Sequence, residues 1–277
     1  MKRILGLAMV LGLVGALIGM AQEAKLASAP DPKSSNDESL TLDEYIRLGL
    51  PAYDRLWSGD DMVKAEKVLT SVSQKGYRQL PRYKSERSGK AFDRLTSAQN
   101  LDFFKDRTFP LNARFPLLIN YFQSSNQVFK LYLAGFLKND VSDSEMVELL
   151  GAQLRSALVL LEIVDEFLPT IKKDDPKYQV RMQGLDQMKR GLASVVAGGL
   201  KTLTERESYR ASELVRLVGY MQETFPQIVL RLPDGSRTET LFRLDKLQDD
   251  PDLKDIQPSL RELRSKVKAA VEKASIP

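Results

Sequence analysis

Histidine and cysteine are both absent from the chain of 277 residues. Without imidazole there can be no serine–histidine triad, no histidine-ligated zinc and no histidine pH switch. Without thiols there can be no disulfide, so the fold depends on core packing. Any catalysis would therefore use carboxylates, lysine, tyrosine, serine or threonine.

Recognisable cofactor and metal motifs are also missing. The sequence holds no Gly-rich phosphate loop, no nucleophile elbow and no dinucleotide fingerprint. The acidic cluster at residues 249–255 offers oxygen ligands, but it lacks the glycine and the distal glutamate of a calcium-binding EF-hand loop. We therefore expect no cofactor and no metal site.

Long apolar runs are scarce, and the one that is present stands near residue 1. Lys2 and Arg3 precede an apolar run over residues 4–18, and small residues follow at the two positions that a signal peptidase reads. That layout is typical of a secretory signal peptide, which we predict over residues 1–21. The alternative is an uncleaved anchor, because the run is about long enough to span a membrane. The many glycines and the lack of a basic stop-transfer cluster favour cleavage.

Residues 22–40 are small, polar and proline-containing, which is typical of a flexible spacer. The prediction is an exported protein, periplasmic or secreted, with no membrane span after the signal peptide is cleaved. Removal of residues 1–21 lowers the formal net charge from +4 to +2. An electrostatic function must therefore depend on local clusters of charge.

Apolar residues at three-and-four spacing predict an all-α fold, a multi-helix bundle over residues 41–225. β-prone runs on either side of Pro233-Asp234-Gly235 predict a β-hairpin over residues 226–247, and a C-terminal helix is predicted over residues 252–277. Some predicted helices begin with a capping box, in which a hydroxyl and a carboxylate satisfy exposed amide groups. These boxes are Thr41 with Glu44, Ser142 with Glu145, and Thr204 with Glu207.

Gly184, Gly191 and Gly198 recur at a fixed spacing in one predicted helix. Each glycine in a helix interior costs about 1 kcal/mol relative to alanine. The stripe therefore predicts the close approach of a partner helix. A ligand groove is the alternative, with the phenylalanine-rich helix over residues 115–136 as the opposite wall of an apolar site.

The densest cluster of charge is the basic segment, residues 75–94, KGYRQLPRYKSERSGKAFDR, with seven positive and two negative side chains. Aromatic residues are interleaved with the charges, a combination that binds anionic polymers by charge pairing and stacking. The alternative is a solvated connector whose aromatic rings pack on the bundle beneath. The predicted binding residues are Lys75, Arg78, Arg82, Tyr83, Lys84, Arg87 and Lys90.

A second candidate site lies at residues 207–226, ESYRASELVRLVGYMQETFP. The segment GYMQETFP resembles the G-L-M-Q-x-x-P segment of lytic transglycosylases, all-α envelope enzymes that cleave peptidoglycan. Glu207-Ser208 is similar to the catalytic Glu-Ser pair of that family. The resemblance implies that Glu207 acts as both acid and base in glycoside cleavage.

Two functions of different class follow from these patterns. The preferred prediction is a non-enzymatic helical protein of the bacterial envelope that binds or scaffolds a partner through the basic segment. Export argues against nucleic acid, so the expected partner is an envelope protein or an anionic envelope polymer. The alternative is a carboxylate-based cell-wall glycosidase that uses Glu207.

Overall fold

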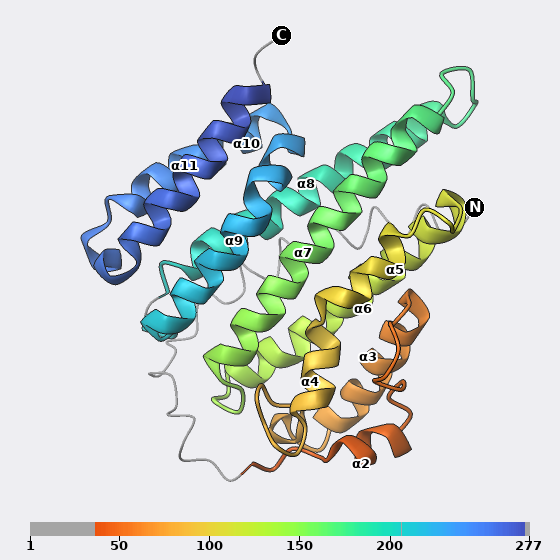
Figure 1. Ribbon diagram of the computed structural model, residues 1–277, viewed down its shortest axis with the longest axis vertical. Helices are drawn as coiled ribbons and strands as arrows, with labels where there is room; N and C mark the ends of the chain where they lie inside the picture. Colours follow the sequence, from red (N-terminus) through yellow and green to blue (C-terminus); the bar gives the residue numbers. More distant parts are fainter. Residues whose placement is uncertain (1–36, 206, 275–277) are drawn as a thin grey trace. The chain divides into compact units, whose positions relative to one another are not determined.

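The computed structural model describes residues 37–205 and 207–274 (Figure 1). The predicted signal peptide and residues 22–36 of the predicted spacer lie outside the described residues. The described residues form helices joined by turns and loops, with no strand among them, so the all-α prediction is confirmed. No helix in this part of the chain combines the length and the apolar character needed to cross a bilayer.

The described residues divide into two compact units. The N-terminal unit comprises residues 37–160 and 207–213, and the C-terminal unit comprises residues 161–205 and 214–274. Compactness alone does not fix domain boundaries, so the helical domain predicted over residues 41–225 stays a prediction.

Short helices and long helices make up the N-terminal unit. The helices α3 and α6 pack side by side, and α2 contacts α4 (Figure 1). Ser97 separates α4 from a 3-10 turn that leads into α5. The helices are α2 (Leu42–Arg47), α3 (Gly59–Ser73), α4 (Gly89–Thr96), α5 (Asp102–Lys105), α6 (Leu111–Phe136) and the part of α7 (Asp143–Phe167) up to residue 160.

Two buried tyrosines tie the aromatic core of this unit to the basic segment. The Tyr45 hydroxyl donates to the carbonyl oxygen of Gln79, and the Tyr132 hydroxyl donates to the carbonyl oxygen of Pro81 at 2.8 Å. The Tyr132 ring meets Phe92 edge to face, with centroids 5.8 Å apart. Since a buried hydroxyl must find a partner, these bonds fix the path of the chain past both carbonyl groups.

The capping box predicted at the first helix is confirmed, because both reciprocal bonds join Thr41 and Glu44 at the start of α2. At the start of α7, the Glu145 carboxylate accepts hydrogen bonds from the backbone N–H of Ser142 at 2.8 Å and from its hydroxyl. The carboxylate half of the second predicted box is therefore also present.

The third capping box, Thr204 with Glu207, was predicted wrongly. The next helix, α9, begins at Ala211, beyond both residues. The Thr204 hydroxyl donates instead to the carbonyl oxygen of Lys201 at 2.7 Å, in the last turn of the preceding helix. A threonine side chain can satisfy either amide groups ahead of it or a carbonyl group behind it, and sequence spacing does not decide between them.

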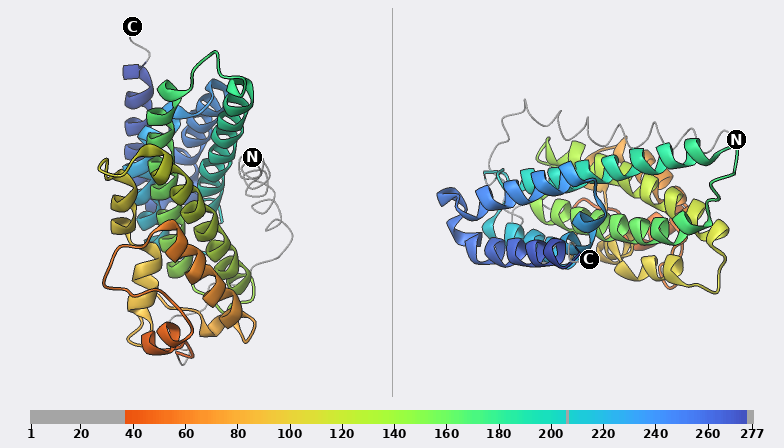
Figure 2. Two further views of the ribbon diagram at one scale, coloured as in Figure 1. Left: turned by 90° about the vertical axis from the view of Figure 1, so that its right-hand side faces the viewer. Right: turned by 90° about the horizontal axis from the view of Figure 1, so that it is seen from above.

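Helices also make up the C-terminal unit. The helices α10 and α11 lie side by side, and α8 contacts α10 (Figure 2). The predicted C-terminal helix is found as a 3-10 turn over Pro251–Ile256 followed by α11. The helices are α8 (Tyr178–Thr202), the part of α9 (Ala211–Arg231) from residue 214 on, α10 (Asp234–Gln248) and α11 (Gln257–Ala274).

The β-hairpin predicted over residues 226–247 is wrong, because this stretch is helical. Pro226 lies inside α9, and the β-prone residues Ile228 and Val229 are fully buried there. Burial on a helix face overrides their strand preference, which amounts to about 1 kcal/mol or less. The Pro-Asp-Gly sequence does not turn a strand but begins α10, with Pro233 at the N-cap.

Some glycines lie at close helix contacts, but not all of these are the glycines that the sequence predicts. A Cβ at Gly59 would lie 2.1 Å from the carbonyl oxygen of Leu117 in α6. A Cβ at Gly199 would lie 3.0 Å from the Met221 side chain, whereas a Cβ at Gly184 would meet nothing within 4 Å. A tight approach thus occurs at Gly199, next to the predicted stripe. Of the stripe itself, Gly184 faces open space, whereas Gly191 and Gly198 are buried.

We expect opposite effects from alanine at two of these glycines. Gly59→Ala should lower the free energy of unfolding by about 1–3 kcal/mol, because the added methyl group meets backbone that cannot move aside. Gly184→Ala should raise it by about 1 kcal/mol, because alanine favours the helix and has room there. Urea unfolding of both variants measures the difference. A shift of the same sign in both would contradict the packing described here.

Candidate functional site

The basic segment leaves α3, passes through a 3-10 turn and a loop, and enters α4. Two residues have positive φ along this path, Gly76 at 144° and Lys84 at 56°. Positive φ is open to glycine but strained for lysine. A strained residue persists only where surrounding contacts hold it, so the loop at Lys84 is fixed by its neighbours.

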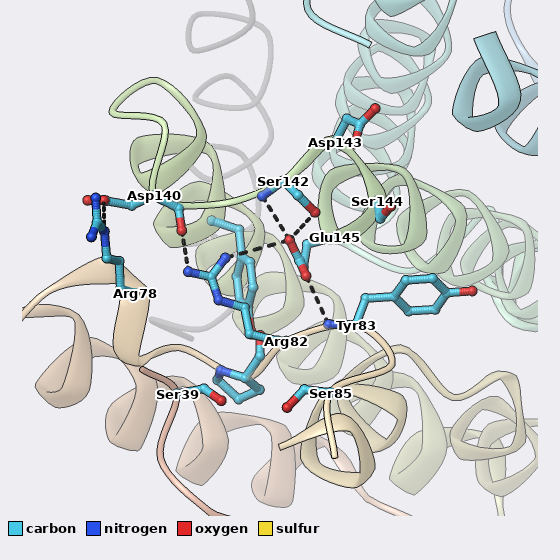
Figure 3. Close-up of polar contacts among 12 residues, drawn as sticks. Ser39, Arg78, Arg82, Tyr83, Ser85, Asp140, Ser142, Asp143, Ser144 and Glu145 are labelled. Atoms are coloured by element: carbon cyan, nitrogen blue, oxygen red, sulfur yellow. Dashed lines mark hydrogen bonds and ion pairs between the residues drawn. The ribbon is translucent and has the colours of Figure 1, made fainter. Parts of the chain in front are cut away.

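Two arginines of the basic segment bind the turn before α7 (Figure 3). The Arg78 Nε donates to the Asp140 carboxylate at 2.8 Å, and the Arg82 guanidinium donates to the Asp140 carbonyl oxygen. Arg78 also pairs with Glu38 at 3.4 Å. These arginines, which the sequence assigned to partner binding, already bind acceptors within the protein.

The carboxylate of Glu145, which is 4% exposed, joins the loop to the start of α7. It accepts hydrogen bonds from the Tyr83 N–H at 2.9 Å and from the Ser142 N–H at 2.8 Å, and lies 3.7 Å from the Arg82 guanidinium (Figure 3). A buried charge is tolerated only when it is paired and hydrogen-bonded. The loop therefore supplies the partners that allow a carboxylate to be buried at this helix start.

Asp143, the first residue of α7, is bound by an arginine from residues 207–213. The Arg210 guanidinium donates to Asp143 Oδ1 at 2.7 Å, and the Arg210 backbone N–H donates to Asp143 Oδ2 at 2.8 Å. Asp143 is buried, and acidic residues are favoured at a helix N-terminus. The pair fixes residues 207–213 against the same helix end that holds the basic segment.

An acidic strap, residues 37–39, lies against the basic segment. The Asp37 carboxylate accepts a hydrogen bond from the Ser85 hydroxyl, and the Ser39 carbonyl oxygen accepts one from Arg87 Nε at 2.9 Å. The buried Ser39 and Ser88 hydroxyls are 2.7 Å apart. The basic segment thus already holds an acidic peptide, contributed by its own chain.

The three lysines of the predicted set, Lys75, Lys84 and Lys90, are exposed. Lys84 Nζ lies 4.9 Å from the centroid of the adjacent Tyr83 ring, which packs edge to face on the buried Phe92. The aromatic rings therefore pack on the bundle, as in the connector alternative. The lysine charges face solvent, and they are the part of the predicted site that is placed to meet a partner.

Large apolar side chains are exposed close to Lys90. The apolar edge, residues 46–56, includes side chains that are 39–50% exposed. Lys90 Nζ lies 5.8 Å from the centroid of Tyr53, which places this edge beside α4. Apolar groups next to positive charge are typical of a surface that binds another molecule. The exposed apolar residues are Ile46, Leu48, Tyr53 and Leu56.

Glu207 lies between α8 and α9 and is exposed. The general acid of a glycosidase is instead held where its surroundings favour the protonated form. Ser208 beside it is buried. Among residues 37–205 and 207–274, no group of three or more Asp and Glu side chains is arranged to hold a metal ion.

Comparisons with known proteins found no match. No protein-family model, no curated protein and no solved structure matches the chain.

The Arg55–Asp61 pair joins the end of the apolar edge to the start of α3. The Arg55 guanidinium donates to both Asp61 carboxylate oxygens at 2.7 Å, and Ser58 completes a capping box with Asp61 at the start of α3. Burial acts to raise the pKa of Asp61, but the hydrogen bonds from Arg55 and Ser58 and the Arg55 charge outweigh burial. They hold the pKa of Asp61 below its usual value.

We expect Glu145→Ala to lower the free energy of unfolding by roughly 1–3 kcal/mol, because the N–H groups of Tyr83 and Ser142 lose their acceptor away from water. Glu44→Ala, at the more exposed capping box of α2, is the matched control and should have a smaller effect. Urea unfolding of both variants gives the comparison. Equal losses would show that Glu145 only caps its helix and does not hold the loop.

Acid should remove the stabilisation that Asp61 supplies. The pKa of Asp61 is lowered in the folded protein, so its contribution is present above the unfolded pKa and is lost as the pH falls through the folded value. Asp61→Asn should therefore be less stable than the parent at pH 7, and the gap should close below about pH 4. Unfolding free energies across that range test this. A gap that stays constant would rule out ionisation as its source.

Proposed function

We propose that the protein is an exported, non-enzymatic helical binding or scaffolding protein of the bacterial envelope. Export is supported by the signal-peptide layout of residues 1–21. The observations that best support binding are the three exposed lysines of the basic segment and the exposed apolar edge, which Lys90 adjoins. Fixed apolar groups next to positive charge suit a partner that is itself acidic and partly apolar.

The acidic strap indicates the chemistry of that partner. Asp37 and Glu38 contact Ser85 and Arg78 of the basic segment, so this surface is built to accept carboxylates from an extended chain. The pairs are exposed, and exposed ion pairs contribute about 0–1 kcal/mol each. A partner with more carboxylates than the strap would compete for these positions and would also meet the lysines.

Within the predicted set, the lysines are the residues that we assign to partner contact. Arg78, Arg82 and Arg87 shape the surface, because they bind acceptors in the turn before α7 and in the strap. Lysine is a flexible and strongly hydrated charge, so it can meet a partner without losing a bond that the fold needs. The contact should weaken with salt, since exposed charges are screened beyond about 10 Å at 0.1 M.

The cell-wall glycosidase is the alternative of a different class. It would use Glu207, which lies between α8 and α9 and is exposed to water. No observation on the described residues favours this reaction over binding. Loss of peptidoglycan cleavage on Glu207→Gln would be the result that establishes it.

We expect the triple variant Lys75→Glu, Lys84→Glu and Lys90→Glu to lose an envelope partner that the parent protein retains on a column at low salt. The reversed charges repel an acidic partner, while the fold keeps its arginine contacts. The measurement is a pull-down from envelope extract, repeated at moderate salt, with circular dichroism to verify folding.

The matched control reverses three exposed basic residues elsewhere, Lys254, Arg261 and Lys273. It makes the same change in net charge and should still retain the partner. If both variants lose the partner equally, only the overall charge matters. If the triple variant binds as the parent does, the basic segment is a solvated connector and the proposal is wrong.

A further inference from the structure

Arg94, the last basic residue of the basic segment, differs from the others in being buried. It lies in α4 and is 8% exposed. Its Nε is shut off from solvent and has no hydrogen-bond partner among the described residues. A guanidinium stays charged at any physiological pH, so this is a largely buried positive charge with one unsatisfied donor, its Nε.

Arg114 is a second buried arginine in this unit, and its hydrogen bonds can be compared with those of Arg94. It is 4% exposed, and its guanidinium donates to the carbonyl oxygens of Phe109 at 2.9 Å and Phe104 at 2.8 Å. Those bonds tie α6 to the chain before it. Arg94 is buried to a similar degree, yet no comparable bond reaches its Nε.

The surroundings of Arg94 are polar but do not neutralise it. The Asn100 amide donates to the Arg94 carbonyl oxygen at 2.8 Å and lies 3.3 Å from the Tyr121 hydroxyl, so this cluster holds the backbone of α4. Of the nearby charges, Arg55 adds to the positive potential, and its carboxylate partner Asp61 is already engaged. The opposing charge is Asp54, which is exposed.

Burial lowers the pKa of Arg94, and the nearby charge of Arg55 lowers it further, against the opposing effects of Tyr121 and Asp54. An isolated buried charge destabilises a fold by several kcal/mol unless a counterion and hydrogen bonds compensate it. An anion with two oxygens is the group that matches a guanidinium, since it accepts two parallel N–H bonds.

We propose that Arg94 is the centre of a binding site for a small oxyanion, a carboxylate or a phosphate group, at the edge of α4 beside the apolar edge. The anion accepts from the Arg94 guanidinium. The site goes beyond the proposed function, and its test is separate because it changes none of the exposed lysines.

The test is the thermal midpoint of unfolding of the purified protein in inorganic phosphate, sulfate or acetate, with chloride added to hold the ionic strength constant. We expect at least one of these anions to raise the midpoint by about 2–4 °C at tenfold excess over its dissociation constant. A response to phosphate and sulfate indicates a phosphoryl ligand, and a response to acetate alone indicates a carboxylate.

Arg94→Met removes the charge and keeps much of the side-chain length, so it should abolish the rise. It should also be about as stable as the parent without the anion, because the unsatisfied buried donor is gone. Arg190→Met, an exposed change of the same charge in the C-terminal unit, should keep the rise.

Calorimetric titration of the parent protein with the same anions measures binding directly, so it tests the proposal even if Arg94→Met fails to fold. Saturable binding to one site supports it. Titrations without saturable binding overturn it, as do equal midpoint shifts in the parent and in folded Arg94→Met.

Discussion

The carboxylate of Glu145 is the contact on which the arrangement of the N-terminal unit depends. It sits at the start of α7, almost fully buried, and accepts N–H groups from its own helix end and from Tyr83 in the loop of the basic segment. A buried carboxylate with one missing partner would destabilise the fold, whereas one with all its partners fixes the geometry of everything it touches. The strained backbone of Lys84 lies beside Tyr83, so the bond from Tyr83 to Glu145 helps to hold that strain.

In the same region, arginine and lysine side chains have different surroundings. The arginines Arg78, Arg82 and Arg87 donate to carbonyl and carboxylate oxygens of the chain itself, while the lysines remain in water. The physical reason is geometric, because a guanidinium presents several donors in a rigid plane and can bridge two segments, whereas an ammonium is a single hydrated charge. A strongly basic stretch can therefore be mostly structural and still present a positive face. Arg94 departs from this division, since it is an arginine that is buried without an acceptor for its Nε.

The position of the candidate site could be found from the sequence, but its hydrogen bonds and ion pairs could not. Clustered charge marks the basic segment directly, and the interleaved aromatic residues indicate that part of it packs on the bundle. The acidic partners were missed because they are distant along the chain: Glu38 lies before α2, and Asp140 lies after α6. Their only signal in the sequence is negative charge near a turn or a helix start, which many surface residues share. Burial of Arg94 was equally hidden, since a residue in a charged stretch gives no sign that it points inward.

The sequence by itself determined the all-α class, the exclusion of imidazole and thiol chemistry, and the helix starts at Thr41 and Ser142, because spacing and local capping act within a few residues. Only the tertiary structure decided the stretch after Phe225. There, burial of two β-prone residues on one helix face outweighed their strand preference and carried α9 past a proline. It also decided which positive charges face solvent, because that depends on carboxylates and carbonyl groups brought from elsewhere in the chain. Local preferences amount to about 1 kcal/mol or less per residue, and burial of a large side chain amounts to about twice that, so long-range packing prevails wherever the two disagree.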